Sequence, residues 1–351
     1  MDLSSRGSIF LKFLFVMSVI FYFVFFNTQK PRVLILHSYA TDYTWVTNIN
    51  DGLARAFGNR TDFSLHWQYM NTKNHPTVSY KQKMGVLVRR LIARLQPSII
   101  IAMDDDAQEF VAKFYVDDPR ITVIFGGVNG ELNDYGYINT RNVTGILERV
   151  PFAAVRDTFI YLIGAKKKPE EIKFINLGDQ SSTVRLDEKQ LLGFNWSPVN
   201  LMDSVLVEDF QEWKEAVKEI ENRADILFIT NYRQLVRKKG DERFISPREV
   251  MEWTVKNSKI PVVGGNGFVT EDGAYISVGA SPYEQGNVVG EMALKVLAGT
   301  PAYKIPIQTT QQFLVYMRKD IAGGTEKKLP LIYEAFARGI GKFYGRTVEI
   351  K

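Results

Sequence analysis

The chain has no cysteine in 351 residues, and this absence removes several classes of function at once. It excludes a disulfide framework, a thiolate metal site, a cysteine nucleophile and a lipoprotein anchor. Histidine is scarce as well, since His37, His66 and His75 are the only three, and their spacing is not that of metal ligands. The formal net charge of +5 is small for this length, and no basic stripe is interleaved with aromatic residues. We therefore expect no nucleic-acid partner.

The sequence also lacks the short motifs of common catalytic and nucleotide-binding sites. It contains no GxSxG nucleophile elbow, and Gly264, Gly265 and Gly267 do not form a GxGxxG pattern. From these absences we predict no catalytic residue, no metal and no cofactor, and we predict that the protein is not an enzyme.

One long apolar run is present, at the amino terminus. Arg6 and Lys12 precede the run Phe13 to Phe26, and a basic segment before an apolar run is typical of an export signal. No small residues form a cleavage site after the run. This favours an uncleaved signal anchor, a transmembrane helix, over a cleaved signal peptide. In either case we expect the protein to be periplasmic or otherwise extracytoplasmic, tethered to the inner membrane or released from it.

Strand and helix patterns alternate through the rest of the chain. Short β-branched runs such as Val33–Leu36 and Ser98–Met103 read as buried strands, and amphipathic stretches such as Val78–Leu95 separate them. This β-α-β rhythm predicts the α/β class with two doubly wound parallel-sheet lobes. Further expected elements include a helix over 107–115, a strand over 309–317, and a helix after Ser246-Pro247 with a capping box.

We expect the following division of the chain. Residues 1–30 form the signal segment, residues 31–145 the N-terminal lobe and residues 146–278 the C-terminal lobe. Residues 279–306 return to complete the first lobe, residues 307–325 complete the second, and residues 326–351 form a helical tail. Such repeated crossing predicts a hinge and a ligand cleft between the lobes.

Polar and aromatic residues follow the expected strands, where the carboxyl ends of a parallel sheet face the ligand crevice. The candidate ligand-binding residues are Ser38, Tyr39, Asp42, Tyr43, Trp45, Asp104, Asp105, Asn129, Ser181, Ser182, Thr183, Asn231, Tyr232 and Asn266.

Each group has a second interpretation. Tyr43 and Trp45 would equally well cover the core. An acid of the run Asp104–Asp106 would pair with a ligand amino group, hold a divalent metal, or complement a helix N-terminus, and Asp106 is expected to act as a cap. The hydroxyls of residues 181–183 suit either a ligand oxygen or helix capping.

Five segments resemble, in order, the ABC-transporter substrate-binding proteins, including their tryptophan/tyrosine-binding type. They are VLILHSYATDYTW, IIIAMDDDAQEF, VIFGGVN, NVTGILERVP and VGASPYEQGNVVGEMALKVLAGTPAYKIPIQ. The resemblance implies the type I periplasmic binding fold, with a ligand closed between two lobes. The three successive acids and the tail from Lys328 depart from the usual pattern of the family.

The resemblance also implies a function. We expect a protein that captures a small polar solute, such as an amino acid or related metabolite, and delivers it to ABC permease subunits in the inner membrane. Two alternatives stay open, namely a ligand-sensing subunit of a signalling system and a membrane-anchored, metal-dependent glycosyltransferase.

Overall fold

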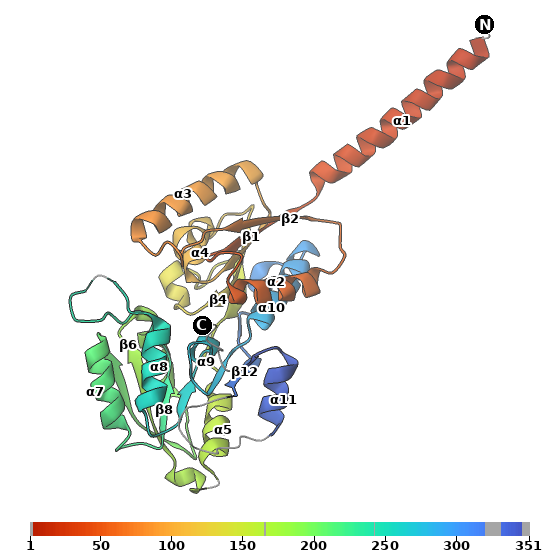
Figure 1. The fold of residues 1–351 in the computed structure, drawn as a ribbon. Coiled ribbons are helices and arrows are strands. Elements are labelled where there is room, and N and C mark those ends of the chain that lie inside the picture. The colour runs from red at the N-terminus through yellow and green to blue at the C-terminus, as the bar shows by residue number, and fades with distance from the viewer. Residues whose placement is uncertain (1–2, 165, 242, 320–330, 346–351) are drawn as a thin grey trace, which may run out of the picture. The chain divides into compact units, whose positions relative to one another are not determined.

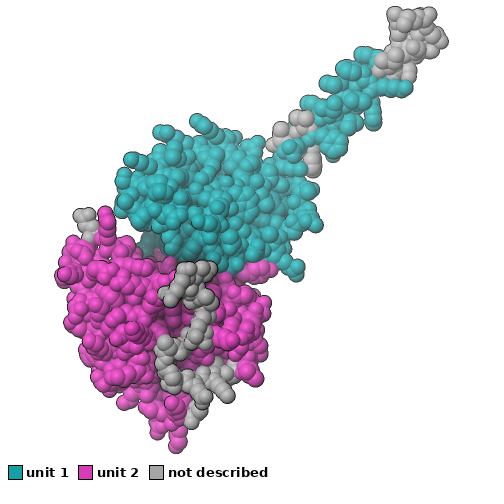
Figure 2. Space-filling model, viewed as in Figure 1, with its two compact units in different colours: residues 1–126, 132–145, 286–307 teal, residues 127–131, 146–285, 308–351 magenta. Residues whose placement is uncertain are grey.

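The computed structural model describes residues 3–164, 166–241, 243–319 and 331–345 (Figure 1). The chain divides into two compact units, coloured separately in Figure 2. Unit 1 takes residues 1–126, 132–145 and 286–307, and unit 2 takes residues 127–131, 146–285 and 308–351. Each unit is built around its own sheet and core.

The elements that belong wholly or mainly to unit 1 are as follows. They are α1 (Leu3–Gln29), β1 (Arg32–His37), α2 (Thr44–Phe57), β2 (Ser64–Tyr69), α3 (Val78–Leu95), β3 (Ile99–Met103), α4 (Asp105–Phe110), η1 (Ala112–Tyr115), β4 (Thr122–Val128), η2 (Leu132–Tyr135), β5 (Val143–Leu147), α10 (Pro282–Leu297) and η4 (Ala302–Lys304). The boundary between the units falls within β4, β5 and α10.

The sheet that contains the strands of unit 1 has the order β11-β5-β4-β3-β1-β2, in which β11 (Gln308–Thr309) comes from a segment counted with unit 2. Its pairs β1–β2, β1–β3 and β3–β4 are parallel. Strands β1 and β3 are buried on both faces, as central parallel strands are expected to be. On one side of this sheet, α10 approaches α2 closely. A Cβ added to Gly286 of α10 would lie 2.0 Å from the carbonyl oxygen of Ile49 in α2. On the other side α3 packs against α4, since a Cβ on Gly85 would lie 2.6 Å from the Phe110 oxygen.

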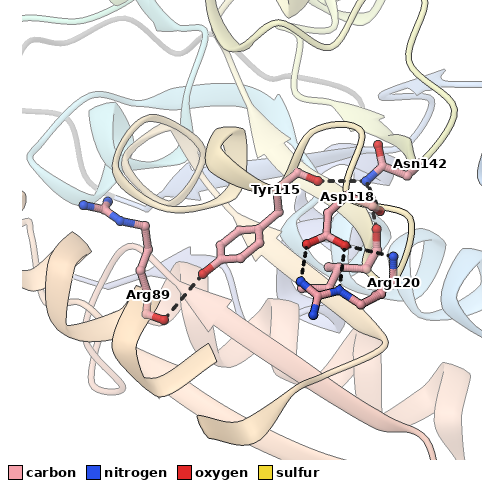
Figure 3. Close-up of polar contacts among 6 residues, drawn as sticks. Arg89, Tyr115, Asp118, Arg120 and Asn142 are labelled. Carbon is pink, nitrogen blue, oxygen red and sulfur yellow. Dashed lines mark hydrogen bonds and ion pairs between the residues drawn. The ribbon is translucent and has the colours of Figure 1, made fainter. Parts of the chain in front are cut away.

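The loop that leads into β4 is held by Asn142 (Figure 3). Its amide nitrogen donates to the carbonyl oxygens of Tyr115 and Ile121, both at 2.8 Å, and of Asp118 at 3.2 Å. Its amide oxygen accepts from the backbone N–H of Asp117 at 2.8 Å. One side chain therefore satisfies four backbone groups of a turn, at the end of the sheet opposite the carboxyl ends of its strands.

The elements of unit 2 follow the same βα plan. They are α5 (Phe152–Ile163), η3 (Pro169–Glu171), β6 (Lys173–Asp179), α6 (Ser182–Gly193), β7 (Asn200–Val207), α7 (Phe210–Ile220), β8 (Ile226–Ile229), α8 (Pro247–Asn257), β9 (Val262–Gly264), α9 (Gly267–Glu271), β10 (Ile276–Ala280), β11 (Gln308–Thr309), β12 (Phe313–Arg318), α11 (Leu331–Gly339) and β13 (Phe343–Tyr344).

The sheet of unit 2 has the order β13-β12-β10-β9-β8-β6-β7, and only the β10–β12 pair among those recorded is antiparallel. Alternate strand residues enter two separate cores. Phe174 and Phe228 pack with α5 on one face, while Ile175 and Leu227 pack with α7 and α8 on the other. Because successive side chains of a strand point to opposite faces of the sheet, each buried strand contributes residues to both cores.

The prediction of two parallel-sheet α/β lobes is confirmed. Three local predictions are wrong. The helix expected over 107–115 breaks at Val111 into α4 and η1, and the strand expected over 309–317 is two strands, β11 and β12, in different sheets. Helix α8 does begin at Pro247, but the Ser246 side chain makes no capping hydrogen bond, and Glu249 instead pairs with Arg237 at 2.8 Å.

The expected signal anchor finds no support here. In the part of the chain that the structure describes, no helix combines the length and the apolar character that a membrane span requires.

Candidate functional site

The loops after β1 and β3 carry most of the predicted residues of unit 1. The two strands are paired in register, with His37 opposite Met103, so Ser38 and Asp104 leave the sheet side by side. The loop after β2, which runs alongside, brings Lys73 to the same edge. Sequence reasoning missed Lys73, although it follows a strand of the same sheet.

Ser38 is used inside the protein. Its hydroxyl donates to the Met103 carbonyl oxygen at 2.7 Å and accepts from the Ala107 N–H at 2.8 Å. The side chain is buried, and it satisfies an N–H in the first turn of α4, which the N-terminal residue Asp104 does not do. Ser38 therefore holds the loop and the helix together.

Asp104 stands at the centre of the unit 1 cluster. Its Oδ1 accepts a hydrogen bond from Trp45 Nε1 at 2.8 Å, whereas its buried Oδ2 has no hydrogen-bond partner among the described residues. Only 3% of the residue is exposed. Burial raises the pKa of the Asp104 carboxyl well above its usual range, and the Trp45 hydrogen bond acts against this shift.

The backbone of Asp104 is also unusual, with φ 65° and ψ 166°. This region of conformational space is essentially restricted to glycine and costs about 1–3 kcal/mol for other residues. The surrounding structure holds Asp104 there, in part through its N–H, which donates to the Gly126 carbonyl oxygen at 2.8 Å.

Tyr39 and Tyr43 form an aromatic pair beside this carboxylate. Their ring centroids lie 5.6 Å apart at a steep angle. The ammonium nitrogen of Lys73 lies 3.6 Å from the centroid of the Tyr43 ring and 5.0 Å from that of Tyr39. Burial, and next the negative charge of Asp104, raises the pKa of Tyr39, so the Tyr39 ring stays neutral and attractive to a cation.

The other two acids have protein partners. Asp105 Oδ1 accepts from the Tyr135 hydroxyl at 2.7 Å, and Asp106 pairs with Lys81 at 2.9 Å. The expected cap is therefore wrong for Asp106, since Asp104 is the N-terminal cap residue of α4. Asp42 is exposed in the turn before α2. Among the described residues that were searched, no group of His, Asp or Glu could hold a metal ion.

In unit 2 the loops after β6 and β8 are tied to each other. Asp179 accepts from the Ser181 N–H and the Gln234 N–H, each at 2.9 Å, through its two carboxylate oxygens. Asn231 Oδ1 accepts from the N–H groups of Tyr232 and Arg233, at 2.8 and 3.0 Å. Asn231 thus shapes its own turn, with its side chain half-buried at the edge of the sheet.

Two buried hydroxyls lie at this edge of the sheet. Ser181 Oγ and Thr230 Oγ1 are buried and have no hydrogen-bond partner within the described ranges. Thr183 is half-buried in the first turn of α6, and the side chain of Ser182 lies outside the described residues. Thr230, which directly precedes the candidate Asn231, was not among the residues predicted from the sequence.

Tyr232 and Asn266 contact the protein itself. Tyr232 is fully buried and its hydroxyl donates to Asp272 at 2.6 Å, while Asp272 also pairs with Arg233 at 3.0 Å. Asn266 donates to the Thr230 carbonyl oxygen at 3.2 Å and remains half-buried.

Asn129 belongs to unit 2 and lies in a network of its own. Its amide donates to Glu148 at 3.2 Å. The Arg149 guanidinium donates to the carbonyl oxygens of Val128 and Asn129, at 3.1 and 3.0 Å, which holds this short segment against β5. The ligand-binding role of all these predicted residues stays a prediction.

Comparisons with known proteins agree with this architecture. A family model described as ABC transporter substrate binding protein matches residues 160–326. The comparison with curated proteins gives no match.

Several solved structures have the same fold at low sequence identity. A conserved domain protein from Vibrio cholerae O1 biovar El Tor is 15% identical with a TM-score of 0.61, over 88% of this chain and 98% of its own. The ABC domain in complex with L-Trp from Streptococcus pneumoniae is 14% identical with a TM-score of 0.58, over 87% and 98%. CD0873, a substrate-binding protein with adhesive properties from Clostridium difficile in its ligand-free, open form, is 15% identical with a TM-score of 0.60, over 85% and 97%.

Together these findings confirm the resemblance drawn from the sequence. The chain has the fold of type I periplasmic binding proteins and, over residues 160–326, the sequence pattern of the ABC transporter substrate-binding protein family.

Proposed function

We propose that the protein is an extracytoplasmic solute-binding protein that captures a small polar solute and delivers it to an ABC-type importer. The observation that carries this proposal is the family match over residues 160–326, which includes the unit 2 loops with Ser181, Asn231 and Asn266. Both sheets also present polar side chains at the carboxyl ends of their parallel strands, where ligands of open α/β sheets bind.

Amino acids are the first solutes to examine. The side chains of the unit 1 cluster, Tyr39, Tyr43, Trp45 and Asp104, combine aromatic surface with a buried carboxylate. The pneumococcal structure of the same fold holds L-Trp. A hydrophobic side chain and an amino group in one small molecule would use both features.

We propose no catalytic step for this protein. The sequence offers no cysteine and no nucleophile elbow, and the hydroxyl of Ser38 is committed to α4. A binding role requires only that the cluster recognises a solute and releases it unchanged.

Thermal unfolding of the full-length chain against a solute library, with and without EDTA, tests the proposal. A solute that binds only the folded state at a hundredfold excess over its dissociation constant adds about 2.7 kcal/mol of stability. We expect a rise in Tm with a small polar metabolite, unchanged by EDTA. A rise in Tm only with sugar nucleotides plus a divalent metal would reject the proposal and favour a glycosyltransferase. The absence of any rise in Tm across the library would also reject the proposal.

A transport assay separates an importer subunit from a sensor. Cells that lack the protein should lose uptake of the solute identified above and regain it with the wild-type gene. Unchanged uptake together with an altered transcriptional response to the solute would instead identify a sensory role.

A further inference from the structure

Asp104 Oδ2 is a buried carboxylate oxygen with no hydrogen-bond partner in the described part of the chain. A polar atom buried without a partner costs about 1–3 kcal/mol, and a charged one costs more. The neighbouring acids do not share this property, because Asp105 accepts from Tyr135 and Asp106 is paired with Lys81. One hydrogen-bond partner is therefore missing at one defined atom, and a donor placed there would stabilise the ionised carboxylate against the effect of its burial.

The backbone of Asp104 adds a second cost at the same residue. Glycine would occupy φ 65°, ψ 166° without strain, yet the chain has aspartate. Trp45 fixes the carboxylate by holding Oδ1 at 2.8 Å, which leaves Oδ2 in a set position. Strain, burial and a missing donor at one oriented carboxylate are what a preorganised binding group has before its ligand arrives.

The aromatic pair beside Asp104 is a surface for a cation. Lys73 Nζ already lies over the rings of Tyr43 and Tyr39, at 3.6 and 5.0 Å from their centroids. The positive charge of Lys73 also acts on the Asp104 carboxylate. An ammonium group is thus compatible with this location, and here it comes from an exposed side chain of the protein itself.

We propose that the cluster of Tyr39, Tyr43, Trp45 and Asp104 recognises an N–H-bearing ammonium group of the solute, and that the Lys73 ammonium occupies the aromatic surface until the solute displaces it. Asp104 Oδ2 accepts a hydrogen bond from the solute ammonium, and the two tyrosine rings stabilise its charge. This inference rests on the proposed solute-binding function and names the class of solute, a primary or secondary amine.

The test uses paired probes. Each of the common L-amino acids is compared with its N-acetyl derivative, which has the same side chain but no ammonium group, by thermal unfolding and then by calorimetry on the full-length chain. We expect stabilisation only by the free amine. An N-acetyl derivative that binds within twofold of its parent overturns the proposal.

Two substitutions locate the recognition. Asp104→Asn keeps an acceptor for Trp45 but removes the carboxylate charge, and it should weaken amine binding at least tenfold. Asp106→Asn removes the same charge two residues away, from a carboxylate already paired with Lys81, and should change affinity less than threefold. Equal effects of both substitutions would show a general loss of negative charge and would overturn the assignment to Asp104.

A third substitution tests the displacement of Lys73. Lys73→Met keeps the apolar stem and removes the ammonium, so amine affinity should rise several-fold. Weaker binding would show that Lys73 contacts the solute, and it would overturn this part of the proposal.

Trp45→Phe gives an independent check, because it frees Oδ1 while leaving Asp104 in place, and it should weaken amine binding without losing the preference for the amine.

The outcomes separate this inference from the proposed function. If a sugar or an anion stabilises the wild type and Asp104→Asn equally, the solute-binding function stands and the ammonium site falls. If no solute stabilises the wild type, the function itself falls.

Discussion

Single residues in unit 1 have ionisation states that depend on burial. His37, at the end of β1, is fully buried and stacks on Tyr69 with ring centroids 5.1 Å apart. Burial lowers its pKa from 6.5 to about 4, so the imidazole is neutral at physiological pH. Neither ring nitrogen has a hydrogen-bond partner in the described chain.

This shift predicts a defined pH dependence of stability. Between pH 6.5 and 4 the unfolded chain takes up a proton on His37 while the folded chain does not, so unfolding becomes more favourable as the pH falls. This stabilisation is fully present above pH 6.5, and about 3 kcal/mol of it is lost by pH 4. Denaturant unfolding at pH 6.5 and at pH 4 measures this effect. Between these two pH values His37→Gln should lose less free energy of unfolding than the wild type loses.

The exposed His75 supplies the matched control, since His75→Gln should keep the pH dependence of the wild type. If the free energy of unfolding changes with pH equally in His37→Gln and in the wild type, His37 takes up a proton in the folded protein as readily as in the unfolded chain.

At the scale of elements, small side-chain contacts determine how each loop or helix is placed. Ser38 joins the end of β1 to α4, and Asp179 joins the loops after β6 and β8. Asn142 does the same for the loop before β4, where it satisfies three carbonyl oxygens and one N–H (Figure 3). In the Asp118–Arg120 ion pair on the same loop the Arg120 side chain is exposed, so we expect the pair to contribute little.

We therefore expect Asn142→Ala to lower the free energy of unfolding by about 2–4 kcal/mol, because four hydrogen bonds are lost together. Arg120→Ala, on the same turn, should change it by about 0.5 kcal/mol or less, since the Arg120 side chain is 78% exposed. Urea unfolding of both variants measures the difference. Equal effects would show that the turn is not held by Asn142.

At the scale of the molecule, the two units have separate sheets and cores, and the chain passes between the units several times. Their unfolding is not required to be a single transition, so the effect of a solute is best measured on each transition by itself. The proposed solute-binding role requires that the protein reaches its solute outside the cytoplasm.

We expect residues 1–30 to direct this export. A fusion of the full chain to alkaline phosphatase, which is active only after export, should be active, and the same fusion without residues 1–30 should be inactive at equal expression. Residues 1–30 fused directly to the phosphatase provide the control for sufficiency. Activity in the absence of residues 1–30 would contradict the assignment of an export signal to this segment.

Much of the architecture was predictable from local pattern. Buried aliphatic runs and amphipathic stretches repeat with the periods of strands and helices, and their alternation leads to parallel sheets. The same pattern put Ser38 and Asp104 at the end of neighbouring strands, because residues that follow parallel strands meet at one edge. The sequence by itself therefore determined the fold class and the region in which to look for a site.

The roles of the individual side chains were decided only by tertiary structure. Ser38 is occupied by Met103 and Ala107, Tyr232 is buried against Asp272, and Lys73 lies over two tyrosine rings. Each of these roles depends on atoms that come from separate segments of the chain, and spacing in the sequence carries no information about their distance. For the same reason the sequence left Asp104 and Asp105 as equal candidates, whereas the fold singles out Asp104 by its burial, by its backbone and by its carboxylate oxygen without a hydrogen-bond partner in the described chain.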